Sequence, residues 1–422
     1  MKDGPRPTLR ILFLTHYFPP EGNAPAARVH EMAKRWVRAG HEVTVITGVP
    51  NHPAGRVYDG YRNRPFQREV VDGIRVLRVW TFVAANRGVW RRGLNFASFM
   101  LTASLAGLCV RRHDVLVATS PQLLCGLAGA IVSALRSTPF VLEIRDIWPE
   151  SITTVGAADK TLILRLLERI ERLVYSRAHR IVTVGEGYKE QLLRRGVPAE
   201  RIGIVTNGVD KELFGSMPTE SSVRQRYHLD DRFVCAYVGT IGMAAGLEVV
   251  LRTASLLREK SRTDMVFLLV GDGATRDGLE ESAREQGLDS VVFTGRVDRG
   301  LVPGILATVD ACLVHLRRQA LFESVLPSKI FEAAAMGKPI ILGVKGHAAD
   351  LVTMAQCGIC IEPDDPDGLA RAAVNLADDS ALRRRLGEAG RRYVSVHFDR
   401  DRLSHQYLEI LQSVAAGARP AS

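Results

Sequence analysis

Short apolar runs alternate with segments of helical periodicity along most of the chain, and this alternation limits the possible folds more than any other feature. In the C-terminal half the runs are Phe233–Val238, Met265–Val270, Val291–Gly295, Ala311–Leu316, Pro339–Val344 and Ile359–Ile361. Each has the length of a strand and is largely apolar, as expected for strands that are covered on both faces. Strands that alternate with helices at this spacing form parallel sheets with helices on both sides. This half is therefore predicted to be a doubly wound α/β domain.

The N-terminal half begins with the same pattern. An apolar run at Arg10–Thr15 is followed by a polar loop, a helical pattern at Ala26–Ala39 and a second strand at His41–Thr47. We predict two Rossmann-like domains that face a central cleft, residues 1–205 and 206–395. The last segment, 396–422, carries a helix that is expected to pack back across the junction.

Composition narrows the function classes. Of 422 residues, 46% are hydrophobic and 24% are charged, as in ordinary globular domains, and the net charge of +10 favours an anionic partner. A lipid surface or a phosphorylated ligand is expected rather than nucleic acid, because the chain has no arginine–aromatic stripe and no zinc-finger spacing. The six cysteines have no disulfide-framework spacing, which favours a reducing, cytoplasmic location.

The segment Leu94–Val110 has 17 residues without a charge, and arginines flank it at Arg91, Arg92, Arg111 and Arg112. A spanning helix needs about 20 predominantly apolar residues, so a transmembrane span is not expected. One interpretation is a helix that lies on a bilayer surface, with its arginines at anionic headgroups. The other is a buried core helix with solvated arginines at its ends.

Two loops of the N-terminal half are candidate ligand sites, because ligands bind at the carboxyl ends of parallel strands. Gly22 and Asn23 follow the first strand and could approach a phosphate. Arg145 and Asp146 follow the apolar run Pro139–Ile144. Arg145 could neutralise a phosphate or a carboxylate, and Asp146 could orient a sugar hydroxyl. Alternatively, the two side chains form a pair that fixes the loop.

In the C-terminal half, the stretch Glu323–Ile341 predicts a helix over Ser328–Met336 that is followed by a strand. Glu332 lies among apolar residues of this helix, where a lone carboxylate is costly. It either pairs with Lys329 on the same face or accepts hydrogen bonds from ligand hydroxyls, while Lys329 and the helix N-terminus hold an anion.

Glycines follow several strands of this half, among them Gly239 and Gly242, and together they predict a nucleotide-sized slot. The chain has no P-loop, GxGxxG or HExxH motif, so an NTPase, a dinucleotide enzyme and a required metal are not expected. No cofactor is expected either.

The motifs together resemble a known family. THYFPPEGNAPAARVHEMAKRWVRAGHEVTVITGVPNHPAG, EIRDIWPES, NGVD, YVGTIGMAAGLE and LPSKIFEAAAMGKPII are similar to family-four glycosyltransferases of the GT-B fold, in particular the colanic-acid and O-antigen subgroup with its WbuB-type fucosamine transferases. The resemblance implies a retaining, metal-independent transferase of the hexosyltransferase type. Its donor would be a UDP-sugar, and the transferred sugar would be an N-acetylated deoxy-hexosamine. Its acceptor would be a polyprenyl-diphosphate-linked glycan at the inner face of the cell membrane, in surface polysaccharide synthesis.

The resemblance also assigns roles to residues. Glu332 would hold the ribose diol, and the base would rest near Arg296 and Val297. The phosphates would lie between the start of the Glu332 helix and the loop from Gly239 to Gly242, with Gly22 closing from the other domain. The implied contacts to the donor also include Asn23, Thr240, Leu326, Ser328 and Lys329.

The sequence departs from the family pattern at three places. The first Glu of the family's motif falls on Ser324, with Glu323 adjacent as the candidate catalytic carboxylate. The usual Arg and Lys are missing from GTIGMAAG, so Lys329 is expected to neutralise the leaving diphosphate, with Arg145 or Arg296 helping. The His that often precedes Asp146 in the family is Arg145 here.

Two other functions remain open. A UDP-N-acetylglucosamine 2-epimerase-like isomerase would share the slot but need no second substrate. A weakly active nucleotide-sugar-binding partner would fit the missing Arg–Lys pair.

Overall fold

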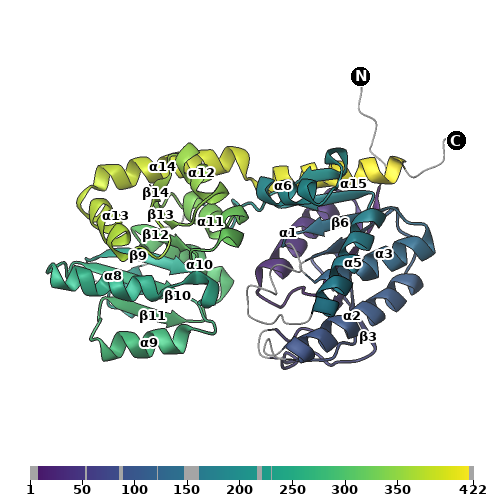
Figure 1. Ribbon diagram of the computed structural model, residues 1–422, viewed down its shortest axis with the longest axis horizontal. Coiled ribbons are helices and arrows are strands. Elements are labelled where there is room, and N and C mark those ends of the chain that lie inside the picture. Colours follow the sequence, from purple (N-terminus) through teal and green to yellow (C-terminus); the bar gives the residue numbers. More distant parts are fainter. Residues whose placement is uncertain are drawn as a thin grey trace, which may run out of the picture. The chain divides into compact units, whose positions relative to one another are not determined.

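The computed structural model describes residues 8–52, 55–84, 89–120, 122–146, 161–215, 221–229 and 231–417. The chain divides into two compact units. The first unit is Met1–Thr206 with Asp401–Ser422, and the second is Asn207–Arg400. Each is a Rossmann-like α/β unit with a predominantly parallel sheet between helices, which confirms the predicted fold class (Figure 1).

The sheet of the first unit has eight strands in the order β3-β4-β2-β1-β5-β6-β7-β8. Their bounds are β1 Arg10–Leu14, β2 Glu42–Gly48, β3 Phe66–Val71, β4 Ile74–Val79, β5 Val115–Thr119, β6 Phe140–Ile144, β7 Arg180–Thr183 and β8 Ile202–Ile204. All neighbours pair in parallel except β3, which runs antiparallel to β4. Asp72 and Gly73 join these two strands with φ angles of 48° and 79°, as a tight two-residue hairpin turn requires.

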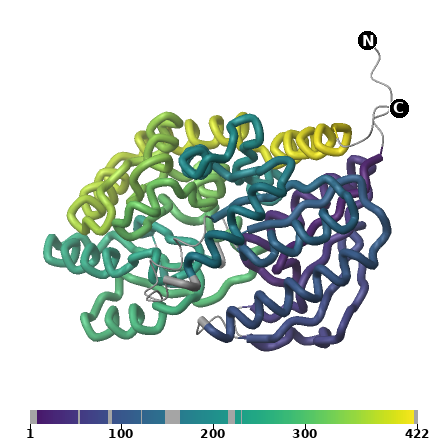
Figure 2. The backbone as a smooth tube through the Cα atoms, turned by 45° about the vertical axis from the view of Figure 1, so that its right-hand side comes forward, coloured from purple at the N-terminus to yellow at the C-terminus, as the bar shows by residue number. Residues whose placement is uncertain are grey.

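Helices cover both faces of this sheet. Those of the first unit are α1 Ala24–Arg38, α2 Val89–Cys109, α3 Leu123–Arg136, α5 Thr161–Arg177, α6 Glu186–Arg194, the 3-10 turn η1 Ala199–Arg201 and α15 Arg400–Gly417. On one face, Phe99 of α2 and Cys125 of α3 pack into the core. On the other, Trp36 of α1 lies edge-on to Tyr407 of α15, with ring centroids 5.3 Å apart. Figure 2 shows how the end of the chain, in yellow, returns to the purple start of this unit.

The second unit has a fully parallel six-stranded sheet in the order β11-β10-β9-β12-β13-β14. Its strands are β9 Phe233–Val238, β10 Met265–Val270, β11 Val291–Gly295, β12 Ala311–His315, β13 Ile340–Gly343 and β14 Gly358–Cys360. Its helices are α7 Ser221–Arg226, η2 Met243–Ala245, α8 Glu248–Glu259, α9 Arg276–Glu285, η3 Arg299–Leu301, α10 Val302–Thr308, η4 Ala320–Ser324, α11 Lys329–Ala335, α12 His347–Met354, α13 Pro366–Asp378 and α14 Ser380–His397.

The uncharged segment of the first unit forms α2, which begins five residues before the predicted start at Leu94. It contributes buried residues, Phe99 and Ala103, to the core beneath it. Among the described helices, none combines the length and hydrophobicity that crossing a bilayer requires.

Candidate functional site

The carboxyl edge of the second sheet brings two glycine loops into backbone contact. Gly271 follows β10 and has a φ of +136°, and a Cβ atom there would lie 2.0 Å from the carbonyl oxygen of Gly239, which follows β9. A Cβ on Gly273 would lie 2.3 Å from the carbonyl oxygen of Ile241. Only glycine permits such approaches, so part of the glycine pattern serves the packing of these loops.

Gly242 differs from these glycines. A Cβ at this position would meet only the Thr240 side chain, at 3.7 Å, and its φ of −119° suits any residue. Thr240 itself is exposed, and its carbonyl accepts a hydrogen bond from the Tyr237 hydroxyl at 2.8 Å. No packing requirement therefore explains Gly242.

Lys329 reaches this loop from α11. Its Nζ lies 3.6 Å from the centroid of the Tyr237 ring, and a Cβ on Gly239 would lie 3.1 Å from the same atom. Burial lowers the pKa of Lys329 to about 7, partly opposed by the charge of Glu332. The Lys329 amine, with its lowered pKa, thus lies against the face of the Tyr237 ring at the glycine loop.

Glu332 lies one turn along the same helix. Burial raises its pKa, while the positive charges of Arg299, Arg400 and Lys329 oppose that shift. Within the described residues, no hydrogen bond or ion pair joins Glu332 to Lys329 or to any other side chain. Of the two alternatives for Glu332, the internal Glu–Lys pair is therefore absent, and within the described residues the carboxylate keeps its acceptor capacity.

The helix that carries both residues is shorter than predicted. It covers Lys329–Ala335, with Ser328 at the N-cap position, and Gly337 follows with a φ of +67°. The Ser328 side chain makes no capping hydrogen bond. Leu326, just before it, packs against the apolar core of the unit.

Three further predicted residues lie in loops at the same edge. Glu323 is exposed at the end of η4, and its backbone lies so close to Gly346 that a Cβ there would be 2.2 Å from the Glu323 carbonyl oxygen. Arg296 follows β11 and is exposed, whereas Val297 packs partly against the core. No contact joins the side chains of Glu323 or Arg296 to Lys329 within the described residues.

Sequence reasoning missed two residues that hold the glycine loop. Arg317, after β12, donates from Nε to the Met243 carbonyl at 2.7 Å and pairs with Glu248. His315 is fully buried, with Nδ1 2.7 Å from the Ala245 carbonyl, and its Nε2 accepts from the Asp364 amide at 2.9 Å. A cation thus reaches the loop GTIGMAAG from a distant segment, although the loop has none of its own.

In the first unit, Gly22 and Asn23 precede α1. Gly22 is exposed, with open space where a Cβ would lie. Asn23 caps α1 by accepting from the Ala26 amide at 2.9 Å, and its Nδ2 is buried without a hydrogen-bond partner in the structure described. The adjacent Glu21 accepts from the amides of Asn51 and His52, so it links the loops after β1 and β2.

Arg145 and Asp146 do not form the pair that was weighed for them. The Arg145 guanidinium lies beside Glu143, Arg28, Tyr188 and Tyr407, and burial lowers its pKa to about 10. Its Nε and one terminal nitrogen are buried without partners among the described residues. Arg145 thus faces the buried polar interior of its own unit.

An ion pair lies beneath Arg145. Arg28 donates from Nε to Glu143 at 2.9 Å, and both side chains are almost fully buried. Arg28 also donates to the carbonyls of Val205 and Thr206 at 2.7 and 2.8 Å. Glu143 is therefore a buried neighbour of opposite charge for Arg145, a contact that the sequence did not predict.

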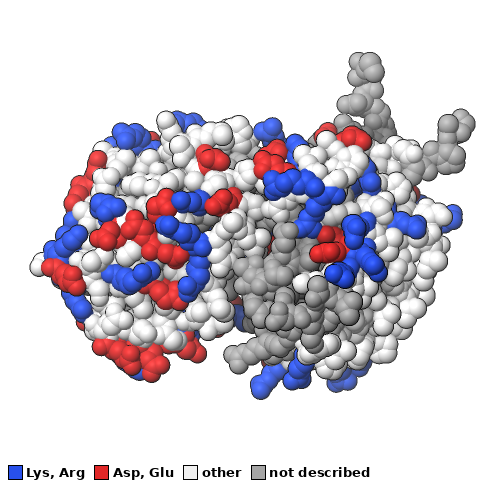
Figure 3. Space-filling model, in the orientation of Figure 1, with Lys and Arg blue, Asp and Glu red and all other residues white. Residues whose placement is uncertain are grey.

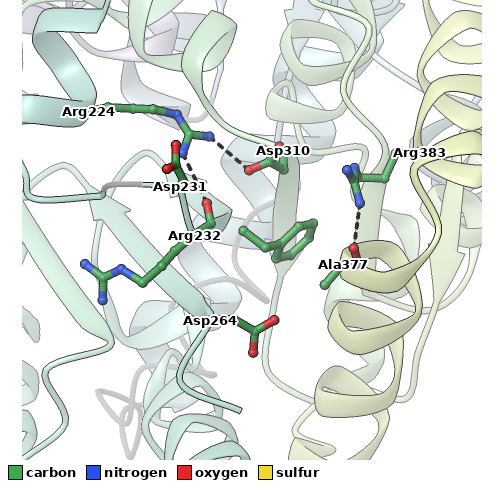
Figure 4. A pocket seen from close by; sticks show the side chains of 8 residues that line it. Arg224, Asp231, Arg232, Asp264, Asp310, Ala377 and Arg383 are labelled. Carbon is green, nitrogen blue, oxygen red and sulfur yellow. Dashed lines mark hydrogen bonds and ion pairs between the residues drawn. The ribbon is translucent and has the colours of Figure 1, made fainter.

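A cavity of about 390 Å³ opens at the opposite, amino-terminal edge of the second sheet (Figure 4). Arg224 reaches across it to Asp310 at 3.1 Å, and Arg383 donates to the Ala377 carbonyl. These two guanidinium groups are thus engaged with carboxylate and carbonyl oxygens of the wall, and the donor residues predicted in this unit lie at the other edge.

The structure therefore brings together Lys329, Glu332, Gly239, Thr240 and Gly242 at one edge of the second unit. Tyr237 joins them, and no pattern in the sequence points to it beyond its place two residues before Gly239. Gly22, Asn23, Arg145 and Asp146 belong to the first unit.

Comparisons with known proteins agree with this architecture. Residues 23–208 match the family described as "Glycosyl transferase 4-like domain", and residues 219–393 match "Glycosyl transferases group 1". The chain is 25% identical over 394 residues to the putative colanic acid biosynthesis glycosyl transferase WcaI of Escherichia coli strain K12, covering 90% of this chain and 96% of that protein.

Two solved structures share the fold. Sucrose-phosphate synthase from Thermosynechococcus elongatus has a TM-score of 0.76 and 18% identity, covering 97% of this chain and all of that one. Anabaena HepE in complex with UDP-glucose has a TM-score of 0.70 and 19% identity, covering 96% of this chain and all of that one. The two matched domains and the shared fold place this chain among the GT-B glycosyltransferases.

Proposed function

We propose that the chain is a retaining, metal-independent glycosyltransferase that takes its sugar from a UDP-sugar. The observation that carries this proposal is the set of Lys329, Glu332 and the glycine loop at one edge of the second unit. Complexes of the structural relative HepE with UDP-glucose support the donor class.

In this proposal the ribose diol donates hydrogen bonds to Glu332. Among the described residues, none occupies the acceptor oxygens of this carboxylate. A buried site that hydrogen-bonds a substrate hydroxyl discriminates strongly against an analogue that lacks it. The base would rest near Arg296 and Val297, and Leu326 and Ser328 would line the slot. The diphosphate would lie against the loop from Gly239 to Gly242, where Gly242 leaves room for it.

The reaction breaks the bond between the anomeric carbon and a phosphate oxygen, and the electron pair stays with the diphosphate. Negative charge therefore grows on the leaving group in the transition state. A protonated Lys329 at the glycine loop would stabilise this charge, and the diphosphate would in turn raise the proton affinity of the amine. Glu323 is assigned to the donor sugar by resemblance. Arg145 and Asp146 are assigned by their position after β6, Asp146 to a sugar hydroxyl and Arg145 as a second cation for the diphosphate.

The acceptor would be a polyprenyl-diphosphate-linked glycan, and the sugar an N-acetylated deoxy-hexosamine, in O-antigen or exopolysaccharide synthesis. The similarity to WcaI, which is named for colanic acid biosynthesis, supports a role in polysaccharide synthesis. The sugar and the acceptor rest on the resemblance of the motifs. Such an acceptor places the enzyme as a peripheral protein at the cytoplasmic face of the membrane. The proposed domain roles follow: residues 1–205 hold the acceptor, residues 206–395 hold the donor, and 396–422 return across the junction.

A thermal-shift screen with UDP, GDP, CMP and ADP, followed by UDP-sugars and membrane-extracted acceptor, tests the proposal. Stabilisation by UDP and transfer to the acceptor are expected. Preference for GDP would overturn the donor assignment. Release of a free epimerised sugar without acceptor would instead identify an isomerase, and donor binding without turnover would identify a binding partner.

A further inference from the structure

One side of α2 is apolar and open to solvent. Trp90, Leu94, Leu101 and Leu105 are 70%, 56%, 59% and 65% exposed. At 100° per residue these four positions fall within an arc of about 60°, so they form a single stripe along the helix. The opposite side, with Phe99 and Ala103, is packed against the sheet.

The edge strand β3 extends this apolar surface. Phe66 and Val70 are 64% and 70% exposed. Phe66 is paired with Val79, and directly paired residues point to the same face of a sheet. Val79 packs in the same core cluster as Phe99 of α2. Phe66 and Val70 therefore face the side of the sheet that α2 covers.

Arginines surround these apolar residues. Seven are exposed and make no ion pair within the described part of the chain: Arg62, Arg64, Arg68, Arg91, Arg92, Arg111 and Arg112. No Asp or Glu occurs between residues 89 and 112. Figure 3 shows that blue groups and no red ones lie along the lower rim of the first unit, below the place where Figure 1 labels α2 and β3.

We infer that these six apolar residues and their arginines, the α2–β3 surface, dock on a bilayer that contains anionic phospholipid. Apolar stripes of this kind bury themselves at the boundary between headgroups and acyl chains, while flanking arginines meet the headgroup phosphates. The charge complementarity selects an anionic bilayer over a neutral one. This inference rests on the proposed function, because it supplies the surface on which a lipid-linked acceptor would be met.

The α2–β3 surface is continuous with the carboxyl edge of the first sheet. Arg92 lies over the Phe96 ring at 5.7 Å, and the Phe96 ring lies 5.3 Å from the ring of His16, which follows β1. His16 is buried, and burial lowers its pKa to about 4, so the ring is neutral near pH 7. The amino end of α2 thus adjoins the edge at which ligands of such folds bind.

Sedimentation with vesicles tests the inference. The full chain should bind vesicles of phosphatidylcholine and phosphatidylglycerol, and bind pure phosphatidylcholine vesicles much less. The double variant Leu101→Glu with Leu105→Glu should lose about tenfold or more in vesicle affinity, because it places two charges on the apolar stripe. Arg91→Gln with Arg112→Gln should lose a similar factor, since each basic residue near an anionic surface contributes about fivefold.

Matched variants elsewhere provide the controls. Leu193→Glu with Met354→Glu changes two other exposed apolar residues, and Arg384→Gln with Arg385→Gln removes the same charge from α14. Both should bind anionic vesicles like the unaltered chain. Equal vesicle binding by the α2 variants and their controls would overturn the inference. It would also be overturned if the unaltered chain self-associates through this surface and Leu101→Glu with Leu105→Glu abolishes that self-association.

Nucleotide binding separates this inference from the proposed function. The α2 variants should keep the thermal shift with UDP. If the α2 variants lose vesicle binding but are still stabilised by UDP, the result supports the α2–β3 surface as the membrane-docking surface. Absence of a UDP shift in the unaltered chain, together with vesicle binding, would remove the proposed donor and leave the surface in place.

Discussion

The ammonium nitrogen of Lys329 lies 3.6 Å from the centroid of the Tyr237 ring. A cation over an aromatic face is stabilised by the ring quadrupole, and the contact fixes the long lysine side chain in one direction. The Tyr237 hydroxyl in turn donates to the Thr240 carbonyl at 2.8 Å. One aromatic side chain therefore positions both the lysine and the glycine loop.

Replacing Lys329 by Ala should lower turnover by about a hundredfold or more, because a transition-state charge contact on the diphosphate is lost. Steady-state kinetics with UDP-sugar and acceptor measure this effect. Near-normal turnover would remove Lys329 from the mechanism. In the absence of ligand, Lys329→Met should raise the thermal unfolding midpoint by a few degrees, because a buried amine is costly to keep charged.

Tyr237→Leu should lower turnover without abolishing UDP binding, because Lys329 loses the ring that positions it. Tyr237→Phe keeps the ring and removes only the hydroxyl, so its turnover should stay closer to that of the unaltered enzyme. The dependence of turnover on pH distinguishes a positioning role from general damage. Tyr237→Leu should shift the apparent pKa that reflects ionisation of Lys329, and Tyr237→Phe should leave this pKa unchanged. If both variants lose turnover equally and neither changes the pH dependence of turnover, Tyr237 does not position Lys329.

The affinity for UDP should fall as the pH rises from about 7 to 9, since the pKa of Lys329 is lowered to about 7 and the amine loses its charge over this range. Ionisation of the UDP phosphate near pH 6 acts in the opposite direction and is complete before this range. Calorimetric titrations at several pH values measure the slope. Lys329→Arg keeps its charge and should show a flat profile; a slope equal to that of the unaltered chain would rule out Lys329 as its source.

Glu332→Ala should weaken UDP binding by about tenfold or more, since the ribose diol loses its acceptor. Binding of 2′,3′-dideoxy-UDP should be nearly the same in both proteins, because this analogue has no diol. If Glu332→Ala lowers the affinity for UDP and for the dideoxy analogue by the same factor, Glu332 does not bind the diol and its role is structural.

Gly242→Ala and Gly271→Ala form a matched pair. The first change meets only the Thr240 side chain at 3.7 Å, so it should leave the unfolding midpoint unchanged and reduce UDP affinity by filling the space for the diphosphate. The second places a Cβ 2.0 Å from the Gly239 carbonyl, so it should destabilise the protein. Unchanged UDP affinity in Gly242→Ala would place the diphosphate elsewhere.

The strands were predictable because their signal is local. Each of the six runs of the C-terminal half is a strand in the structure: three have the predicted bounds, and the other three have ends that shift by one residue. The antiparallel β3 has a weaker local signal, because its exposed Phe66 and Val70 do not form a continuous apolar run.

The contacts of the site depend on residues far apart in the chain. Tyr237 lies 92 positions before Lys329, and no local pattern connects them. Arg145 was expected to face a ligand or Asp146, but Glu143, two residues earlier on the same face of β6, holds its charge inside the unit. Side-chain direction at a strand end follows from packing by α1 and α15, which the sequence does not specify locally.

The position of β3 at the edge of its sheet affects how the protein self-associates in solution without lipid. An edge strand offers unpaired backbone groups to any neighbouring chain, and exposed Phe66 and Val70 would strengthen such an association. Arg68 lies between them on the same face and carries a charge that a second copy would have to bring close to its own Arg68. Repulsion between the two charges is expected to oppose edge-to-edge pairing of two copies, so Arg68 is a residue to keep in any variant made for crystallisation.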